Sequence, residues 1–275
     1  MKAFNGKNAY ITGGSSGIGF STALLLSSLG ANVIIFARNR KKMDKAIHEI
    51  EAKRIDENQK CAAMQLDVTS NSDVKRTMQG AINTFGKPDI LINCAGMAYP
   101  DYFEKIPEKK FDETIRTNLY GMRNTIAALL PALRERKGRI VNVASIAGFI
   151  GVFGYTAYTA SKYAVVGFSE SLRSELKHCG IVVSVLCPPD TDTPGLQLEN
   201  RTKPPETRAV SESAKLMHPD DVAKALVKAL DSKKFIILPG IEGKLIWRIK
   251  RFFPSLVELI MDMQVRAAQR KKSDD

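Results

Sequence analysis

The sequence predicts an α/β fold in three layers, a doubly wound parallel sheet of about seven strands with a C-terminal amphipathic helical extension. Short apolar runs alternate with helical stretches along most of the chain, which is typical of parallel strands joined by crossover helices. The runs are apolar at successive positions, so we expect both faces of the sheet to be covered by helices. A glycine-rich turn follows the first run and opens the first helix.

The expected strands are the runs at 8–11, 33–37, 62–67, 89–93, 139–144, 181–186 and 235–238. The expected helices lie near 18–29, 40–57, 71–85, from 107 to just before 138, from the segment around Tyr158 to about 179, and near 219–231.

Right-handed crossovers bring the carboxyl ends of parallel strands to one edge of the sheet, where ligands bind. Gly13, Asn93, Ser145 and Pro188 each follow a strand, so we expect them to meet at that edge. The segment from about 187 to 218 is too long for an ordinary connection. We expect it to be a substrate loop or lid, with a disordered insertion as the alternative.

Composition indicates a globular protein with one core. The chain has 275 residues, of which 44% are hydrophobic and 25% charged, and its mean hydropathy is -0.15. These values fit one domain over 1–240, followed by a basic amphipathic extension over 241–275. No run approaches the ~20 apolar residues of a membrane span. Residues 1–7 contain no apolar signal region, so we expect a cytoplasmic protein.

Charge and cysteine content narrow the expected partners. The net charge of +12 can attract nucleic acid, anionic lipid or phosphorylated cofactors. The sequence contains no nucleic-acid-binding motif, so we expect no nucleic acid partner. Its four cysteines are scattered without metal-ligand spacing, which predicts reduced thiols and no metal site.

Tyr158 and Lys162 form the most informative pair in the chain. Residues four apart share a helix face, so the phenol and the ammonium can converge on one spot. A phenol titrates near ~10, and a nearby cation favours its charged form, so we expect Lys162 to lower the pKa of Tyr158. The pair predicts a tuned proton donor for a ketone, although the same spacing also occurs on ordinary surface helices.

The segment Gly13-Gly14-Ser15-Ser16-Gly17-Ile18-Gly19 has the context of a dinucleotide-binding turn, because a strand precedes it and a helix follows it. Glycine at 13 suits a tight turn, and Gly17 and Gly19 allow close approach of a pyrophosphate and of the neighbouring strand. The helix start offers free N–H groups to phosphate. The alternative is a glycine turn that binds no ligand.

Taken together, these motifs resemble the short-chain dehydrogenase/reductase superfamily, over residues from about 7 to 240. The motifs that follow the glycine turn in family order are 67–68, 93–96, Ser145, and Tyr158 with Lys162. The chain departs from the family pattern at Cys94, where a second Asn is usual. The resemblance implies a Rossmann fold, a nicotinamide cofactor, and a homodimer or homotetramer.

The resemblance also implies four catalytic residues. Ser145 is expected to hydrogen-bond the substrate oxygen, and Tyr158 to protonate that oxygen as hydride reaches the carbon. Lys162 is expected to tune the tyrosine and hold the nicotinamide ribose. Asn118, in Thr117-Asn118-Leu119, is expected to anchor a water that links Lys162 to solvent.

The cofactor expected is NADPH/NADP, because Arg38 stands where an acidic residue would bind a ribose 2′-hydroxyl. Lys42 is a second candidate for the 2′-phosphate, and Asp67 is expected near the adenine. Thr193 is expected at the nicotinamide, although Pro189 replaces the family's glycine in that loop. The residues expected to contact the dinucleotide are Gly13, Ser15, Ser16, Gly17, Ile18, Gly19, Arg38, Lys42, Asp67, Val68, Asn93, Ala95, Gly96, Tyr158, Lys162, Pro188 and Thr193.

The loop at 188–204 is similar to the substrate loop of the 3-ketodihydrosphingosine (3-dehydrosphinganine) reductases. This resemblance implies NADPH-dependent reduction of the 3-keto group of a long-chain amino ketone to give sphinganine. Asp190 and Asp192 could meet the substrate ammonium, or they could cap turns. Alternatives are another lipophilic carbonyl (a 3-oxoacyl chain, steroid or retinoid) and a non-catalytic NADPH-binding scaffold.

The C-terminal extension fits a lipid substrate. Apolar residues recur at helical spacing over 245–253 and 256–263, and basic residues surround Trp247. Basic amphipathic helices can lie in a membrane interface, so we expect possible peripheral contact through 244–270, on the cytoplasmic face. The alternative is that these apolar faces pack on the domain or on another subunit.

Overall fold

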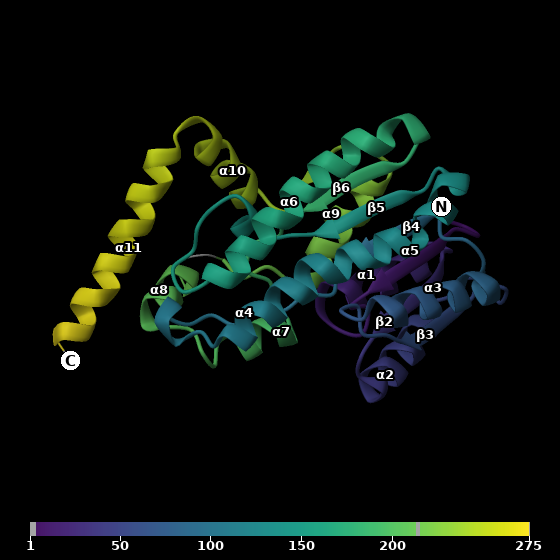
Figure 1. The fold of residues 1–275 in the computed structure, drawn as a ribbon, viewed down its shortest axis with the longest axis horizontal. Coiled ribbons are helices and arrows are strands. Elements are labelled where there is room, and N and C mark those ends of the chain that lie inside the picture. Colours follow the sequence, from purple (N-terminus) through teal and green to yellow (C-terminus); the bar gives the residue numbers. More distant parts are fainter. Residues whose placement is uncertain (1–3, 213–214, 275) are drawn as a thin grey trace.

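The computed structural model describes residues 4–212 and 215–274, and Figure 1 shows their arrangement. Within these residues one parallel sheet has the strand order β3-β2-β1-β4-β5-β6-β7. The chain winds outward from β1 to β3, returns to the middle at β4 and winds the other way, which confirms the predicted doubly wound sheet. The strands are β1 (Asn8–Thr12), β2 (Asn32–Ala37), β3 (Cys61–Gln65), β4 (Ile90–Asn93), β5 (Arg139–Val143), β6 (Val182–Leu186) and β7 (Ile236–Ile237).

Helices cover both faces of this sheet. The α-helices are α1 (Gly17–Ser28), α2 (Arg40–Glu51), α3 (Asn71–Phe85), α4 (Glu108–Ile115), α5 (Gly121–Arg136), α6 (Thr156–Leu176), α7 (Pro194–Glu199), α8 (Pro205–Glu212), α9 (Pro219–Leu230), α10 (Glu242–Phe252) and α11 (Pro254–Asp274). Short 3-10 turns lie at Phe103–Lys105, Ile146–Gly148 and Lys177–Cys179, and a π-helical segment lies at Arg116–Tyr120.

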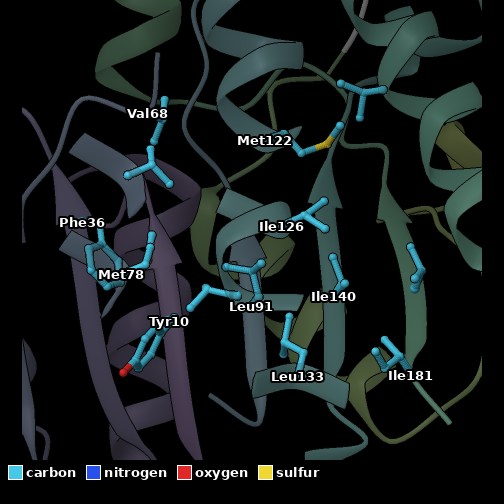
Figure 2. Packing of buried hydrophobic residues seen from close by; sticks show 14 of the residues in the cluster. Tyr10, Phe36, Val68, Met78, Leu91, Met122, Ile126, Leu133, Ile140 and Ile181 are labelled. Atoms are coloured by element: carbon cyan, nitrogen blue, oxygen red, sulfur yellow. The ribbon is translucent and has the colours of Figure 1, made fainter. Parts of the chain in front are cut away.

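Alternate strand residues supply two hydrophobic clusters, one on each face. Tyr10, Leu91 and Ile140 point to the face covered by α3, α5 and α6, where Figure 2 shows them against Met78 and Ile126. The neighbouring strand positions point to the opposite face, which α1, α2 and α9 cover. Both faces of the strands are therefore buried, as their unbroken apolar sequence predicts.

Two helical regions differ from the expectation. The long helix expected between 107 and 138 comprises α4 and α5, joined through the π-helical segment Arg116–Tyr120. The segment 187–218 contains the short helices α7 and α8, each opened by a proline that suits the first helical position. The alternative of a disordered insertion is therefore wrong for the part of the segment that forms these helices. Residues 213–214 lie outside the described part.

The predicted C-terminal extension is helical and consists of α10 and α11. Figure 1 shows α11, in yellow, running beside the domain and returning toward α8, with which it is in contact. Many of its apolar side chains are exposed, including Leu259 at 57% and Met263 at 62%. Among the helices of the described residues, none is long and apolar enough to cross a membrane. The domain boundary at 240 stays a prediction.

Candidate active site

Tyr158, Lys162 and Ser145 lie together at the carboxyl ends of β5 and β6. Helix α6 carries the first two, and the Lys162 Nζ lies 5.4 Å from the centre of the Tyr158 ring. The same Nζ donates a 2.9 Å hydrogen bond to the Val143 carbonyl at the end of β5. Ser145 follows β5, and its side chain hydrogen-bonds Tyr158. The sequence motifs therefore converge on one spot.

The electrostatics of this spot correct one expectation. Burial raises the pKa of Tyr158, the nearby Glu199 carboxylate adds to that rise, and the hydrogen bond with Ser145 opposes it. Burial also lowers the pKa of Lys162 to about 8. The pKa of Tyr158 is therefore raised and not lowered, because the loss of hydration dominates, and a lowering effect of Lys162 on it stays a prediction. The phenol stays protonated at neutral pH.

Asn118 is buried and holds two elements together. Its amide nitrogen donates to the Met97 carbonyl at 2.9 Å and to the Ser161 hydroxyl at 2.8 Å. Its amide oxygen accepts from the Met97 N–H at 2.8 Å. Asn118 lies in the π-helical segment, a form that is frequent at functional sites. The side chain thus ties the loop after β4 to α6, and the water expected beside it stays a prediction.

Asn93 and Val68 belong to the interior. The Asn93 side chain donates to Asn142 at 2.9 Å and accepts from Thr125 at 2.6 Å, and Asn142 in turn donates to Ser169 at 2.8 Å. This chain of hydrogen bonds joins β4, β5, α5 and α6 below the site. Val68 is packed in the hydrophobic cluster. Their side chains are therefore committed to the core, and only their main-chain atoms remain for a ligand.

The glycine turn lies where the sequence placed it. Gly13 has a φ of 67° and passes so close to the loop after β4 that a Cβ would lie 2.8 Å from the Ala95 nitrogen. The adjoining Gly96 faces Asn118 and Lys162, because its Cβ would lie 3.6 Å from Lys162 Nζ. Among the described atoms, the side chain of Ser16 makes no capping bond at the start of α1. The Gly19 N–H hydrogen-bonds the Cys94 sulfur, so the N–H groups of Gly17 and Ile18 are the ones in the first turn that can meet an anion.

The segment after β6 reaches this turn. Thr193 caps α7 by accepting a hydrogen bond from the Leu196 N–H at 3.2 Å. Its methyl group lies 2.9 Å from where a Cβ on Gly17 would be, so Thr193 closes over the turn. The Pro188 carbonyl accepts from the Ile146 N–H at 3.1 Å, which fixes the start of the segment beside Ser145.

Arg38 lines a depression of about 420 Å³ at the ends of β2 and β3. Its other lining residues are Gln65, Leu66, Asp67, Asp73 and Arg76. The Asp67 carboxylate is engaged by Thr69, whose N–H and hydroxyl donate to it at 3.0 and 2.8 Å. Arg76 pairs with Asp73. The side chain of Lys42 is exposed and is not among the residues that line the depression. The main-chain N–H of Lys42 donates to the Asn39 side chain at 3.0 Å, at the start of α2.

Sequence reasoning did not identify a polar group that lies near Tyr158. The Tyr155 ring lies 5.5 Å from the Tyr158 ring, and its hydroxyl donates a 2.7 Å hydrogen bond to Glu199 on α7. Lys203 is buried nearby and pairs with Asp190 at 3.9 Å. Asp192 is exposed. In the sequence Glu199 belongs to a polar segment without periodic pattern, and its position shortly after Pro194, which starts α7, was the available signal.

Comparison with known proteins agrees with this geometry. The family model described as short chain dehydrogenase matches residues 7–204. The chain belongs to the short-chain dehydrogenase family. It is an oxidoreductase of that family, and the predicted superfamily is confirmed. Structures with the same fold include a short-chain dehydrogenase/reductase from Burkholderia phymatum in complex with NAD, with a TM-score of 0.80 and 24% identity over 93% of this chain and 96% of that one.

Several sequence relatives are more similar than these structures. The 3-ketodihydrosphingosine reductase of Bos taurus is 39% identical over 88% of this chain and 73% of the relative. The enzyme of that name from Dictyostelium discoideum is 38% identical over 87% of this chain and 76% of the relative. A 3-oxoacyl-[acyl-carrier-protein] reductase of Staphylococcus aureus is 36% identical, over 66% of this chain and 73% of the relative.

Proposed function

We propose that this oxidoreductase reduces the 3-keto group of 3-dehydrosphinganine with NADPH and forms sphinganine. The observation that carries the proposal is the convergence of Tyr158, Lys162 and Ser145 beside the glycine turn, in a chain 38–39% identical to 3-ketodihydrosphingosine reductases over most of its length. The convergence of these side chains indicates the reaction class, and the similarity to the reductases indicates the substrate.

A nicotinamide dinucleotide fits the residues at the sheet edge. The uncapped start of α1 offers N–H groups to the pyrophosphate. Gly96 has no Cβ, which would lie 3.6 Å from Lys162 Nζ, and Lys162 is proposed to hold the ribose. The bound cofactor supplies the hydride. Ser15, Ile18, Gly19, Ala95 and Pro188 are proposed to complete the contacts through their main chain.

NADP is the proposed form of the cofactor. The depression at the ends of β2 and β3 is lined by the guanidinium groups of Arg38 and Arg76, and a guanidinium binds phosphate through paired hydrogen bonds. Asp73 already neutralises Arg76, which leaves Arg38 as the main ligand proposed for the 2′-phosphate. Asp67 is proposed to lie near the adenine.

The protein groups supply orientation and the proton. Ser145 is proposed to donate a hydrogen bond to the ketone oxygen, and Tyr158 to transfer its phenolic proton to that oxygen. The raised pKa of Tyr158, caused by burial, keeps the proton on the phenol until negative charge develops on the substrate. Lys162, whose pKa burial lowers to about 8, can then restore the proton to Tyr158, with Asn118 proposed to hold the path to solvent.

The C-terminal helices are proposed to rest on the cytoplasmic face of a membrane, which would supply the lipid substrate. The exposed side chains of Leu245, Phe252 and Phe253 are accompanied by Lys244 and Arg248. Such a combination binds anionic lipid surfaces. A homodimer or homotetramer is proposed by analogy with the family.

A second candidate is reduction of a 3-oxoacyl chain, favoured by the similarity to the 3-oxoacyl-[acyl-carrier-protein] reductase of Staphylococcus aureus. The two substrates place a ketone at the third carbon but differ in the amino group. A non-catalytic scaffold is disfavoured, because the proposed proton donor and its partners are all present and in contact.

Mass spectrometry of sphinganine tests the proposal. Purified full-length protein is incubated with synthetic 3-dehydrosphinganine and either NADPH or NADH, and Tyr158→Phe is the control. We expect NADPH-dependent sphinganine from the wild type and at least a hundredfold less from the variant. Reduction of a 3-oxoacyl thioester without reduction of 3-dehydrosphinganine would select the second candidate. Equal rates for Tyr158→Phe and wild type would remove the catalytic assignment.

A further inference from the structure

A carboxylate lies near the catalytic phenol, in addition to Lys162. Glu199, the last residue of α7, accepts a 2.7 Å hydrogen bond from Tyr155, and the Tyr155 ring is tilted against the Tyr158 ring, with the ring centres 5.5 Å apart. Glu199 is also close enough to Tyr158 and Lys162 to shift the pKa of both. Through Tyr155 the carboxylate is therefore connected to the phenol beside which the ketone is proposed to lie.

No close ion pair neutralises this carboxylate among the described residues. Lys203 is buried, with a side chain 2% exposed, and it pairs with Asp190 at 3.9 Å. Its Nζ also donates to Ser211 at 3.2 Å and lies 5.8 Å from the centre of the Tyr155 ring. The charges of Lys203 and Lys162 act on Glu199 without a close contact, and within the described part of the chain no ion pair within 4.0 Å involves the Glu199 carboxylate. Two carboxylates thus share one lysine.

We propose that Glu199 binds the ammonium group of the substrate, an inference that rests on the proposed function. In 3-dehydrosphinganine the amino group is on the carbon next to the ketone. A ketone oxygen held between Ser145 and Tyr158 therefore places the ammonium beside the same phenol. Tyr155 is a positioning residue, because its hydroxyl orients the Glu199 carboxylate.

The energetics favour a cation at this position. A half-buried carboxylate has lost part of its hydration, and an ammonium restores its charge compensation. Burial raises the pKa of Glu199, and it outweighs the opposing hydrogen bond from Tyr155 and the opposing charges of Lys203 and Lys162, so these partners compensate the carboxylate only in part. A neutral ketone in the pocket would leave Glu199 uncompensated, so the site discriminates against ketones that lack the amine.

Two substrates test the inference in the wild-type protein. The first is 3-dehydrosphinganine, and the second is the same long-chain hydroxy ketone with hydrogen in place of the amino group. We expect kcat/KM with NADPH to be roughly 10- to 100-fold higher for the amine, the range of a hydrogen bond to a charged group. Equal kcat/KM for both ketones would overturn the ammonium site and leave the proposed function intact. Reduction of the neutral ketone alone would overturn the proposed function itself.

A variant then assigns the discrimination to its residue. In Glu199→Gln the ratio of kcat/KM for the amino ketone to kcat/KM for the neutral ketone should fall to about threefold or less. Glu170→Gln, an exposed carboxylate of α6, should retain the full preference. An equal loss for both ketones in Glu199→Gln would contradict the inference. The wild-type comparison decides the question even if that variant does not fold.

Discussion

The hydroxyl of Tyr155 donates a 2.7 Å hydrogen bond to the carboxylate of Glu199. This bond joins the start of α6, which carries the proposed proton donor Tyr158, to α7, which lies in the segment after β6. Tyr155 itself is 6% exposed, so the bond is shielded from solvent. The two residues define one wall of the proposed substrate pocket.

Replacement of Tyr155 by Phe should weaken binding of the amino ketone and spare the chemistry. The ring remains to support Tyr158, while Glu199 loses its orienting donor. We expect KM for 3-dehydrosphinganine to rise roughly tenfold and kcat to stay within about threefold of wild type. Steady-state kinetics measure both. Tyr163→Phe, on the same helix but 43% exposed, is the control, and a fall in kcat alone would argue against a positioning role.

Lys162→Met should abolish activity and stabilise the protein at neutral pH. The folded-state pKa of Lys162 is lowered by burial from 10.5 to about 8, so below about pH 8 the folded chain must hold a buried charge. This buried charge lowers the free energy of unfolding of the wild type by up to about 3 kcal/mol. The variant gains less than this, because it loses the hydrogen bond to Val143. The destabilisation disappears as the pH rises from about 8 to above 10, because the unfolded lysine then loses its proton too.

Urea denaturation at a series of pH values measures this difference. Wild-type stability relative to the variant should increase from pH 8 to pH 10, and the gap should be largest and in favour of Lys162→Met near pH 7. A gap that does not change with pH would show that burial does not perturb Lys162.

Arg38→Ala should remove the preference for NADPH. The guanidinium is proposed to bind the 2′-phosphate, which NADH lacks, so KM for NADPH should rise roughly 10- to 100-fold while KM for NADH stays within about threefold. Arg40→Ala is the matched control, because Arg40 is exposed and already pairs with Asp44 at 3.0 Å. Parallel losses with both cofactors would place Arg38 outside the phosphate site.

Gly17→Ala should destabilise the turn and weaken dinucleotide binding. Gly17 has a φ of 55°, and a Cβ there would lie 2.9 Å from the methyl group of Thr193. We expect the free energy of unfolding to fall by about 1–2 kcal/mol, and NADPH fluorescence titration should show weaker binding. Gly167→Ala is the control. It lies within α6 with no atom within 4 Å of its added Cβ, so it should raise stability by about 0.5–1 kcal/mol.

Charge on the apolar face of the C-terminal helices should release the protein from membranes. Phe252 and Phe253 are 70% and 65% exposed, and their joint replacement by Glu should remove apolar contact and repel anionic lipid. Flotation with vesicles of phosphatidylcholine and phosphatidylserine measures the bound fraction, which should also decrease with salt. Phe103→Glu, equally exposed at 69% on another segment, should still float. Flotation of the double variant at the wild-type level would contradict the membrane proposal.

The sheet and the Tyr158–Lys162–Ser145 cluster could be predicted because local signals determine them. Unbroken apolar runs identify strands that are buried on both faces, and topology then brings the residues that follow them to one edge. The spacing of Tyr158 and Lys162 fixes their shared helix face in the same way.

Burial and distant contacts could not be predicted. The direction of the tyrosine pKa depends on how much hydration Tyr158 loses, which spacing does not reveal. Glu199 was hidden because a polar segment between β6 and α9 gives no periodic signal until its prolines are recognised as helix starts. Arg76, from α3, meets Arg38 only through the pairing of β2 with β3.

The two ends of the short helix α7 lie at different parts of the proposed site. At its start Thr193 rests on the dinucleotide turn, and at its end, about 9 Å further along its axis, Glu199 reaches the substrate side. A ligand that immobilises one end of α7 also restricts the motion of its opposite end. Binding of the dinucleotide should therefore strengthen binding of the ketone, and the reverse. Thermodynamic reciprocity requires the two enhancements to be equal. Occupancy by the oxidised coenzyme would then retain the alcohol product by the same route.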